Sequence, residues 1–236
     1  MADFSGSTGE LRRALVRLLE AGDFEQRTGE LSRFDPRRAV SPLIGLLCAT
    51  AELPRWRAVR ALGLLVAGLA QSDAESARIV MRRLIWSLND ESGGIGWGAP
   101  EAMGEIMAQS ERMAYEYAPI LISYIRKEGN PLENELLERG VLWGIGRLAQ
   151  VRPELVRPWG EEIALRVASG DAAQRGLAAW CLGILGAHRW REALEALGAD
   201  ESAVVLFADG KVAQHRVCDL AAGALQADRL RKGHGG

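Results

Sequence analysis

Tryptophan, arginine and glutamate side chains recur at four-residue spacing in several segments of the sequence. The residues concerned are Trp56, Arg60, Trp97, Glu101, Glu105, Arg139, Trp143, Arg147 and Trp180. Residues four apart lie on the same face of a helix. Guanidinium groups pack well on tryptophan rings, and both residue types are enriched where proteins bind their partners. The pattern therefore predicts a recognition strip that binds a partner by stacking and charge.

The same side chains have a second interpretation, in which they hold the fold together. Tryptophans at helical spacing also pack between neighbouring helices. The charged residues Arg60, Glu101, Glu105 and Arg139 could form ion pairs between repeats, and each exposed pair would contribute little to stability. The sequence leaves both interpretations open.

An acidic, glycine-rich loop comes directly before Trp97. Asp90 and Glu91 precede four glycines within seven residues, and Pro100 suits the first turn of a helix. Glycines let a backbone turn sharply or approach a ligand closely. The carboxylates would repel phosphate, and the loop lacks the GxxxxGK[ST] pattern of a phosphate-binding loop. We expect either a tight turn between repeats or a site beside Trp97 for a cationic group.

Residues that carry covalent or metal chemistry are sparse. The 3 histidines are isolated from one another, and the 3 cysteines show no CxxC spacing. The sequence holds neither an HExxH helix nor a GxSxG elbow. Cys181 falls among small apolar residues, which is typical of an inert packed thiol. We therefore expect no catalytic residue, no metal and no cofactor.

The charge and hydropathy of the chain exclude further classes. A net charge of -2 and a pI of about 6.0 disfavour nucleic-acid binding, which leans on a surplus of basic residues. The longest apolar run, residues 61–70, is too short to cross a bilayer, which needs about 20 residues. The first residues lack a basic start and an apolar core, so we expect no secretion signal and a cytoplasmic protein.

Helices must position the strip, and the sequence repeats a pair of them about every 40 residues. Four segments combine small residues, a bulky apolar residue and a glycine: RWRAVRALGLL, WGAPEAMGEIM, RGVLWGIGRLA and RGLAAWCLGIL. Another apolar helix is expected before each of them, at residues 37–49, 76–87, 117–127 and 159–168. The equivalent glycines are Gly63, Gly104, Gly146, Gly183 and Gly223. Small residues there would let neighbouring helices approach closely, so the pattern predicts a stacked helical solenoid.

The whole chain, residues 1–236, is expected to form a single domain. Two amphipathic helices at 9–34 precede the repeats at 35–190, and a cap follows at 191–228. Asp209-Gly210 lies between two segments that read as short strands, which predicts a β-hairpin at 203–217 before a last helix at 219–227. The hairpin either caps the end of the solenoid or offers an edge to a partner strand. Residues 229–236 are expected to be disordered.

Two stretches resemble a known family. AVSPLIGLL followed by RWRAVRALG resembles the HEAT-like repeat of phycobilin lyases and of many bacterial scaffold proteins, over residues 23–187. DESGGIGWGAPEAMGE is similar to a stretch in a group of bacterial HEAT-like proteins of unassigned function. The resemblance implies an all-α HEAT-like α-solenoid, a right-handed superhelix of helix pairs whose second helices line a concave surface.

The resemblance leaves several functions open. We expect a non-enzymatic interaction or scaffold module that binds a protein segment or a small cationic ligand on the concave face. The alternative is a HEAT-like DNA glycosylase for alkylated bases, with Trp97, Glu101, Arg139, Trp143 and Arg147 in the groove, although the acidic chain speaks against duplex binding. A tetrapyrrole-handling role rests on repeat similarity alone and ranks lowest.

Overall fold

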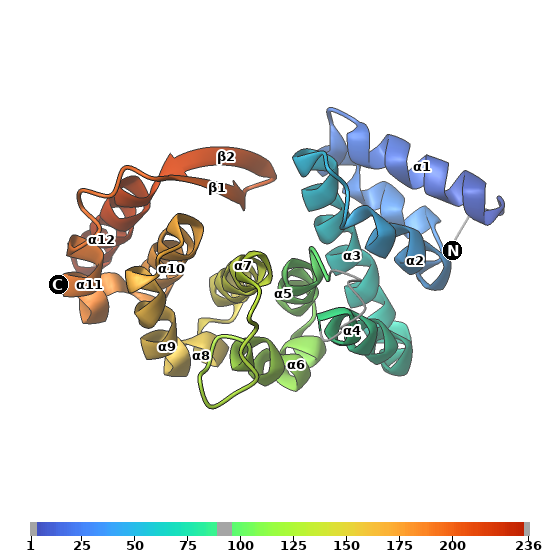
Figure 1. Ribbon diagram of the computed structural model, residues 1–236. Helices are drawn as coiled ribbons and strands as arrows, with labels where there is room; N and C mark the ends of the chain where they lie inside the picture. Colours follow the sequence, from blue (N-terminus) through green and yellow to red (C-terminus); the bar gives the residue numbers. More distant parts are fainter. Residues whose placement is uncertain (1–3, 89–95, 234–236) are drawn as a thin grey trace. The chain divides into compact units, whose positions relative to one another are not determined.

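The computed structural model describes residues 4–88 and 96–233, with the backbone alone for residues 228–233. The described chain is helical apart from one two-stranded sheet, so the expected all-α repeat fold with a short β-hairpin is confirmed (Figure 1). It divides into two compact units, Met1–Tyr117 with Asp209–Lys211, and Ala118–Ala208 with Val212–Gly236. The single domain expected over residues 1–236 stays a prediction.

The first unit begins with an amphipathic helix. Helix α1 (Thr8–Glu20) starts at a capping box in which Ser7 and Glu10 bond each other's backbone, and its four leucines are buried. The next element, η1 (Phe24–Arg33), is a 3-10 helix where the sequence suggests an α-helix. The hydroxyl groups of Thr28 and Ser32 donate to carbonyls three residues back, which favours the tighter turn.

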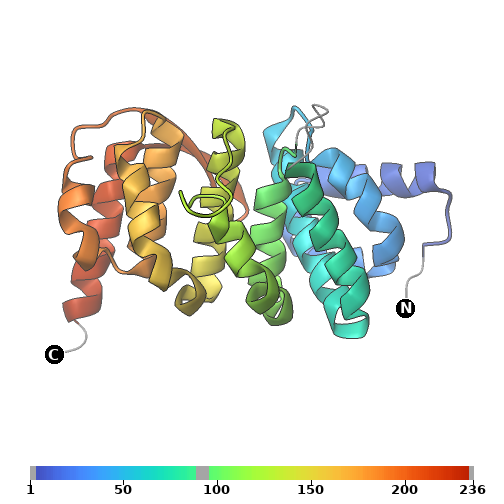
Figure 2. The ribbon, with the colours of Figure 1, turned by 60° about the horizontal axis from the view of Figure 1, so that its bottom comes forward.

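Two helix pairs follow in this unit (Figure 2). They are α2 (Pro36–Leu46) with α3 (Glu52–Ser72), and α4 (Ala74–Leu88) with α5 (Ala99–Gln109); α6 (Glu111–Ser123) comes next. Helix α3 packs against α2, α4 and α5. The buried Arg57 of α3 donates to the carbonyls of Leu19 at 2.7 Å and Ala21 at 2.9 Å, and so satisfies the end of α1.

The second unit contains the remaining helices and the hairpin apart from Asp209–Lys211. Its long helices are α7 (Glu135–Val151), α10 (Ala172–Leu185) and α12 (Val217–Gly233). Short helical pieces separate them: α8 (Pro153–Val156), η2 (Arg157–Trp159), α9 (Gly160–Ala164), η3 (Leu165–Ala168), η4 (Ala187–Trp190) and α11 (Arg191–Glu195). The helix expected at 159–168 is thus broken, and Pro158 accounts for the end of α8 because proline cannot donate to the preceding turn.

The expected role of the aligned glycines is confirmed at three positions. A Cβ atom on Gly63 would lie 2.4 Å from Glu105 Cγ, one on Gly146 would lie 2.2 Å from the Trp180 ring, and one on Gly183 would lie 2.7 Å from the Cβ of Ala224. Only a residue without a side chain allows these approaches of α3 to α5, α7 to α10 and α10 to α12.

The predicted hairpin is also confirmed. Strands β1 (Ala203–Ala208) and β2 (Lys211–Arg216) are joined by Asp209 and Gly210, whose φ values of 51° and 75° define the primed turn that suits a two-residue loop. Helix α12 continues to Gly233, beyond the expected end at residue 227, and residues 234–236 lie outside the described chain. Within the described residues, none of the helices combines the length and apolarity needed to cross a membrane.

Candidate functional site

The tryptophans of the predicted strip differ widely in exposure. Trp56 and Trp143 are buried, with 6% and 3% of their surface exposed, and Trp180 is half-buried. Trp97 is exposed at 42%. The packing interpretation therefore describes Trp56 and Trp143, and only Trp97 of the four presents a largely open ring.

Trp143 is fixed by the hairpin of the second unit. Its indole Nε1 donates to the carbonyl oxygen of Phe207 at 2.8 Å, and the two ring centroids lie 6.2 Å apart. A buried indole that satisfies its N–H on a strand carbonyl is a packing element. The hairpin thus covers part of the helix face on which the sequence places the strip.

The charged residues of the first unit pair between α3 and α5. Arg60 Nη1 bonds Glu105 Oε1 at 2.5 Å, and Gln109 Nε2 donates to the same oxygen at 2.8 Å. Arg55 Nη1 lies 3.6 Å from Glu101 Oε1. Both carboxyl groups are buried, with 2% of Glu105 and 7% of Glu101 exposed. These pairs are the inter-repeat ion pairs that the packing interpretation expects.

Sequence reasoning missed Arg55. Its guanidinium lies 5.0 Å from the centroid of the Trp56 ring, within range of a cation–π contact. The residue falls outside the four-residue spacing of the strip, which is why that pattern passes over it. A search for opposite charges one repeat apart could have found it, because Arg60 and Glu105 are separated by 45 positions and Arg55 precedes Glu101 by nearly the same interval.

The carboxyl group of Glu101 is only partly satisfied. Its Oε2 atom is buried and has no hydrogen-bond partner among the described residues. Burial raises the pKa of this carboxyl above the ordinary 4.5, because a low-dielectric surrounding disfavours the charged form, while Arg55 acts in the opposite direction. The site therefore contains a carboxyl group that gains from a further hydrogen-bond donor.

We expect the charge of Glu101 to destabilise the first unit. The native state holds the proton to a higher pH than the unfolded chain, so the contribution of this group to the free energy of unfolding falls as the pH rises from 4.5 to the raised pKa. The variant Glu101→Gln removes this titration. Its melting temperature relative to wild type should therefore increase over that pH range and stay constant above it.

Thermal melts of both proteins at a series of pH values measure this difference. The other carboxylates, including Asp73 with its pKa lowered to about 2, are common to both proteins and cancel. A difference that is the same at every pH would contradict a buried, titrating Glu101.

The loop before α5 is placed only in part. Asp90 and Glu91 lie outside the described residues. Helix α5 begins at Ala99, after Gly98 in the left-handed conformation with φ 75°, so Trp97 precedes the helix. The expected helical spacing between Trp97 and Glu101 is therefore wrong, because the chain turns at Gly98 between the two residues.

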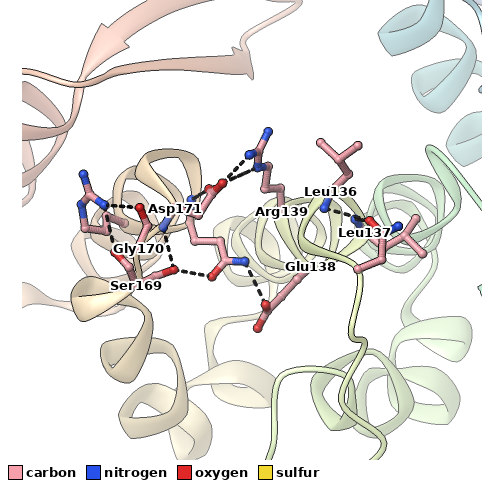
Figure 3. Close-up of polar contacts among 10 residues, drawn as sticks. Leu136, Leu137, Glu138, Arg139, Ser169, Gly170 and Asp171 are labelled. Carbon is pink, nitrogen blue, oxygen red and sulfur yellow. Dashed lines mark hydrogen bonds and ion pairs between the residues drawn. The ribbon is translucent and has the colours of Figure 1, made fainter.

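In the second unit, Arg139 fastens α7 to the beginning of α10 (Figure 3). Its Nε lies 3.0 Å from Asp171 Oδ2, and Asp171 also caps α10 by accepting from the Gln174 backbone N–H at 2.8 Å. Burial acts to raise the pKa of Asp171, but the hydrogen bonds from Arg139 and Gln174 outweigh it and the pKa is lowered. Arg147 donates to Gln150 at 3.2 Å.

A second group of side-chain hydrogen bonds also connects these repeats. Gln174, only 4% exposed, donates to Glu138 at 2.8 Å and accepts from the Ser169 hydroxyl at 2.8 Å. Arg166 donates to the other oxygen of Glu138 at 2.6 Å. These groups satisfy one another, so they hold the repeats in register.

Among the described residues, no group of three or more histidine, cysteine or acidic side chains is close enough to hold a metal ion. Cys181 is buried and donates to the carbonyl of Leu142 at 3.3 Å. Burial raises the pKa of its thiol, which leaves it protonated and unreactive at neutral pH.

The strip residues divide between the two units. Trp56, Arg60, Trp97, Glu101 and Glu105 belong to the first, and Arg139, Trp143, Arg147 and Trp180 belong to the second. Of the five residues that the glycosylase alternative employs, Trp143 is buried under the hairpin and Arg139 is bound to Asp171. Trp97 is the accessible residue of this set in the first unit.

Comparison with known proteins gives one relative and several structural neighbours. No family model matches the chain. An uncharacterized protein of Archaeoglobus fulgidus is 31% identical over 147 residues, which cover 62% of this chain and 74% of the relative. That relative is archaeal, so the expected bacterial group is not supported by it.

The structural neighbours include designed repeat proteins. A designed armadillo repeat protein in complex with the peptide (KR)4 is similar with a TM-score of 0.52 and 18% identity, over 93% of this chain and 99% of that protein. A second designed armadillo repeat protein has a TM-score of 0.51 and 19% identity, over 95% of each chain. At these identities the likeness shows the fold, which is that of stacked helical repeats.

Proposed function

This chain belongs to the same family as the uncharacterized protein of Archaeoglobus fulgidus, and we propose that it is a non-enzymatic interaction module. The proposed partner is a protein segment with basic side chains, which binds at the beginning of α5 in the first unit. The observation that carries the proposal is the 42% exposure of Trp97, since the other large aromatic side chains of the strip are buried or half-buried.

The position of Trp97 suits a binding anchor. It stands before Gly98 and Pro100, and the proline ring restricts φ in the first turn of α5, which reduces the conformational entropy lost when a partner binds. An exposed tryptophan on a rigid support is typical of an interface hot spot. A lysine or arginine side chain of the partner would lie on the face of the ring.

Glu101 supports a basic partner. Its carboxyl has an oxygen without a hydrogen-bond partner among the described residues, and the residue lies in the first turn of α5, the helix that follows Trp97. Approach of a cation would favour the charged form of this group and offset the cost of its burial. The glycosylase alternative has no comparable observation in its favour among the described residues.

A peptide of alternating lysine and arginine is the first probe, because a designed protein of similar fold is in complex with such a peptide. Fluorescence anisotropy of the labelled peptide measures the affinity. We expect Trp97→Ala to raise the Kd about tenfold, the effect of losing one anchor residue. Glu101→Gln should weaken binding in the same direction and lower its dependence on salt.

Tyr115→Ala provides the matched control, because Tyr115 is a 57% exposed aromatic residue of the same unit on α6. Its Kd should equal that of wild type. An equal loss in both aromatic variants, or the same affinity for an alternating glutamate and glycine peptide, would contradict a specific basic-segment site at Trp97.

A further inference from the structure

Three arginines of α1 differ from most arginines of the repeats in their polar contacts. Arg12, Arg13 and Arg17 are exposed, and no hydrogen bond or ion pair joins them to another described residue. Several other arginines of the first unit have acidic partners: Arg37 pairs with Asp73, Arg60 with Glu105, and Arg78 with Glu116. Helix α1 therefore presents three exposed guanidinium groups that form no ion pair with a described residue.

Two of these arginines line a hollow. Arg13 and Arg17, one helical turn apart, surround it with Phe4, Gly6 and Glu10, and its volume is about 380 Å³. Small-molecule sites in proteins have volumes from about 300 to 1,000 Å³. The hollow lies entirely within the first unit, and Trp97 is not among its lining residues.

Two other residues that line the hollow, Phe4 and Gly6, are held in place by several contacts. The backbone N–H of Phe4 donates to the Arg33 carbonyl at 3.1 Å, and the Phe4 ring lies 5.5 Å from the ring of Phe34. Arg38 donates to the carbonyl of Gly6. A Cβ atom on Gly6 would lie 2.8 Å from the Phe4 ring, so only glycine permits this ring position.

The carboxylate in the lining is already engaged. Glu10 accepts from the backbone N–H of Ser7 at 2.7 Å and from its hydroxyl at 2.8 Å. This carboxylate serves the cap of α1 and also lies within electrostatic reach of Arg13, while neither Arg13 nor Arg17 makes a hydrogen bond or ion pair with a described residue. The hollow thus combines a pair of bidentate donors with an aromatic ring.

We propose that this hollow is a binding site for a small phosphomonoester that carries a planar ring. The guanidinium groups of Arg13 and Arg17 bind the phosphate oxygens, since planar forks suit tetrahedral oxyanions and remain charged at all physiological pH values. The Phe4 ring packs against the planar ring of the ligand. The site is separate from the proposed segment-binding site at Trp97.

The test uses AMP, adenosine and inorganic phosphate as probes of the full-length protein. Isothermal titration calorimetry should detect AMP, with inorganic phosphate binding at least about tenfold more weakly and adenosine weaker still. Arg13→Gln and Arg17→Gln should each raise the Kd for AMP about tenfold. Phe4→Leu should weaken AMP and leave inorganic phosphate unchanged, because it removes the stacking partner alone.

Arg12→Gln is the matched control. Arg12 is an exposed, unpaired arginine of the same helix that does not line the hollow. Its Kd for AMP should remain that of wild type, and circular dichroism should show equal helix content in every variant. An equal loss in Arg12→Gln would show general charge attraction and overturn the proposal. So would absence of binding of AMP to the wild type at about 5 mM.

Discussion

Replacing Trp143 with alanine is expected to lower the stability of the second unit by about 3–5 kcal/mol, the usual cost of truncating a fully buried tryptophan. The ring is 3% exposed, packs against Phe207 and donates a hydrogen bond to its carbonyl. Truncation leaves a cavity between α7 and the hairpin and removes the donor. Native-state hydrogen exchange of amides in α7, α10 and β1 measures the loss without assuming that both units unfold together.

Trp86→Ala is the control for this prediction. Trp86 is 72% exposed on α4, so its removal should change stability by less than about 0.5 kcal/mol. Trp143→Phe keeps most of the apolar volume and loses the indole N–H. Its loss of stability should therefore lie between those of Trp143→Ala and Trp86→Ala. If Trp143→Ala lowered the free energy of unfolding as little as Trp86→Ala, Trp143 would be a surface residue available to a partner, as the strip interpretation holds.

Gly146→Ala is expected to destabilise the second unit by about 2 kcal/mol. The added Cβ would lie 2.2 and 2.6 Å from ring atoms of Trp180 and 2.8 Å from the sulfur of Cys181, so α7 and α10 must separate. This cost exceeds the gain of about 0.5–1 kcal/mol that alanine brings to a helix interior. The same exchange experiment, or urea unfolding followed by circular dichroism, measures it.

Gly223→Ala should have the opposite sign. Gly223 occupies the equivalent position of α12, but a Cβ atom there would meet no described atom within 4 Å. The variant should gain about 0.5–1 kcal/mol from helix propensity alone. Equal effects at Gly146 and Gly223 would mean that the glycines are not required for helix contact.

Local chemistry made much of the fold predictable from the sequence. The Asp209-Gly210 turn needs positive φ at both positions, and this requirement identifies the hairpin without knowledge of its surroundings. The glycines at 63, 146 and 183 mark helix contacts because a close approach excludes any other residue. Hydrophobic periodicity does not predict the 3-10 geometry of η1 or the break in the helix expected at 159–168. Both depend on which of several local hydrogen bonds forms.

The candidate site was less predictable, because exposure depends on what packs over a residue. Trp143 and Trp97 look alike in the sequence, yet a hairpin more than sixty positions away buries one while the other stays open. Likewise, Arg139 can pair with Asp171 only when α10 is packed against α7. Spacing identifies residues that share a helix face, and the partner of that face is decided by distant parts of the chain.

The bond between Trp143 and Phe207 has a consequence for how the second unit unfolds. Arg139 and Asp171 are 32 positions apart and Cys181 and Leu142 are 39 apart, whereas this bond spans 64. In a linear array each repeat touches only its neighbours, so the end can fray while the rest stays folded. A link that passes over α10 couples α7 to the hairpin. Loss of the terminal repeat then also uncovers Trp143, so fraying becomes more costly and the unit melts more cooperatively.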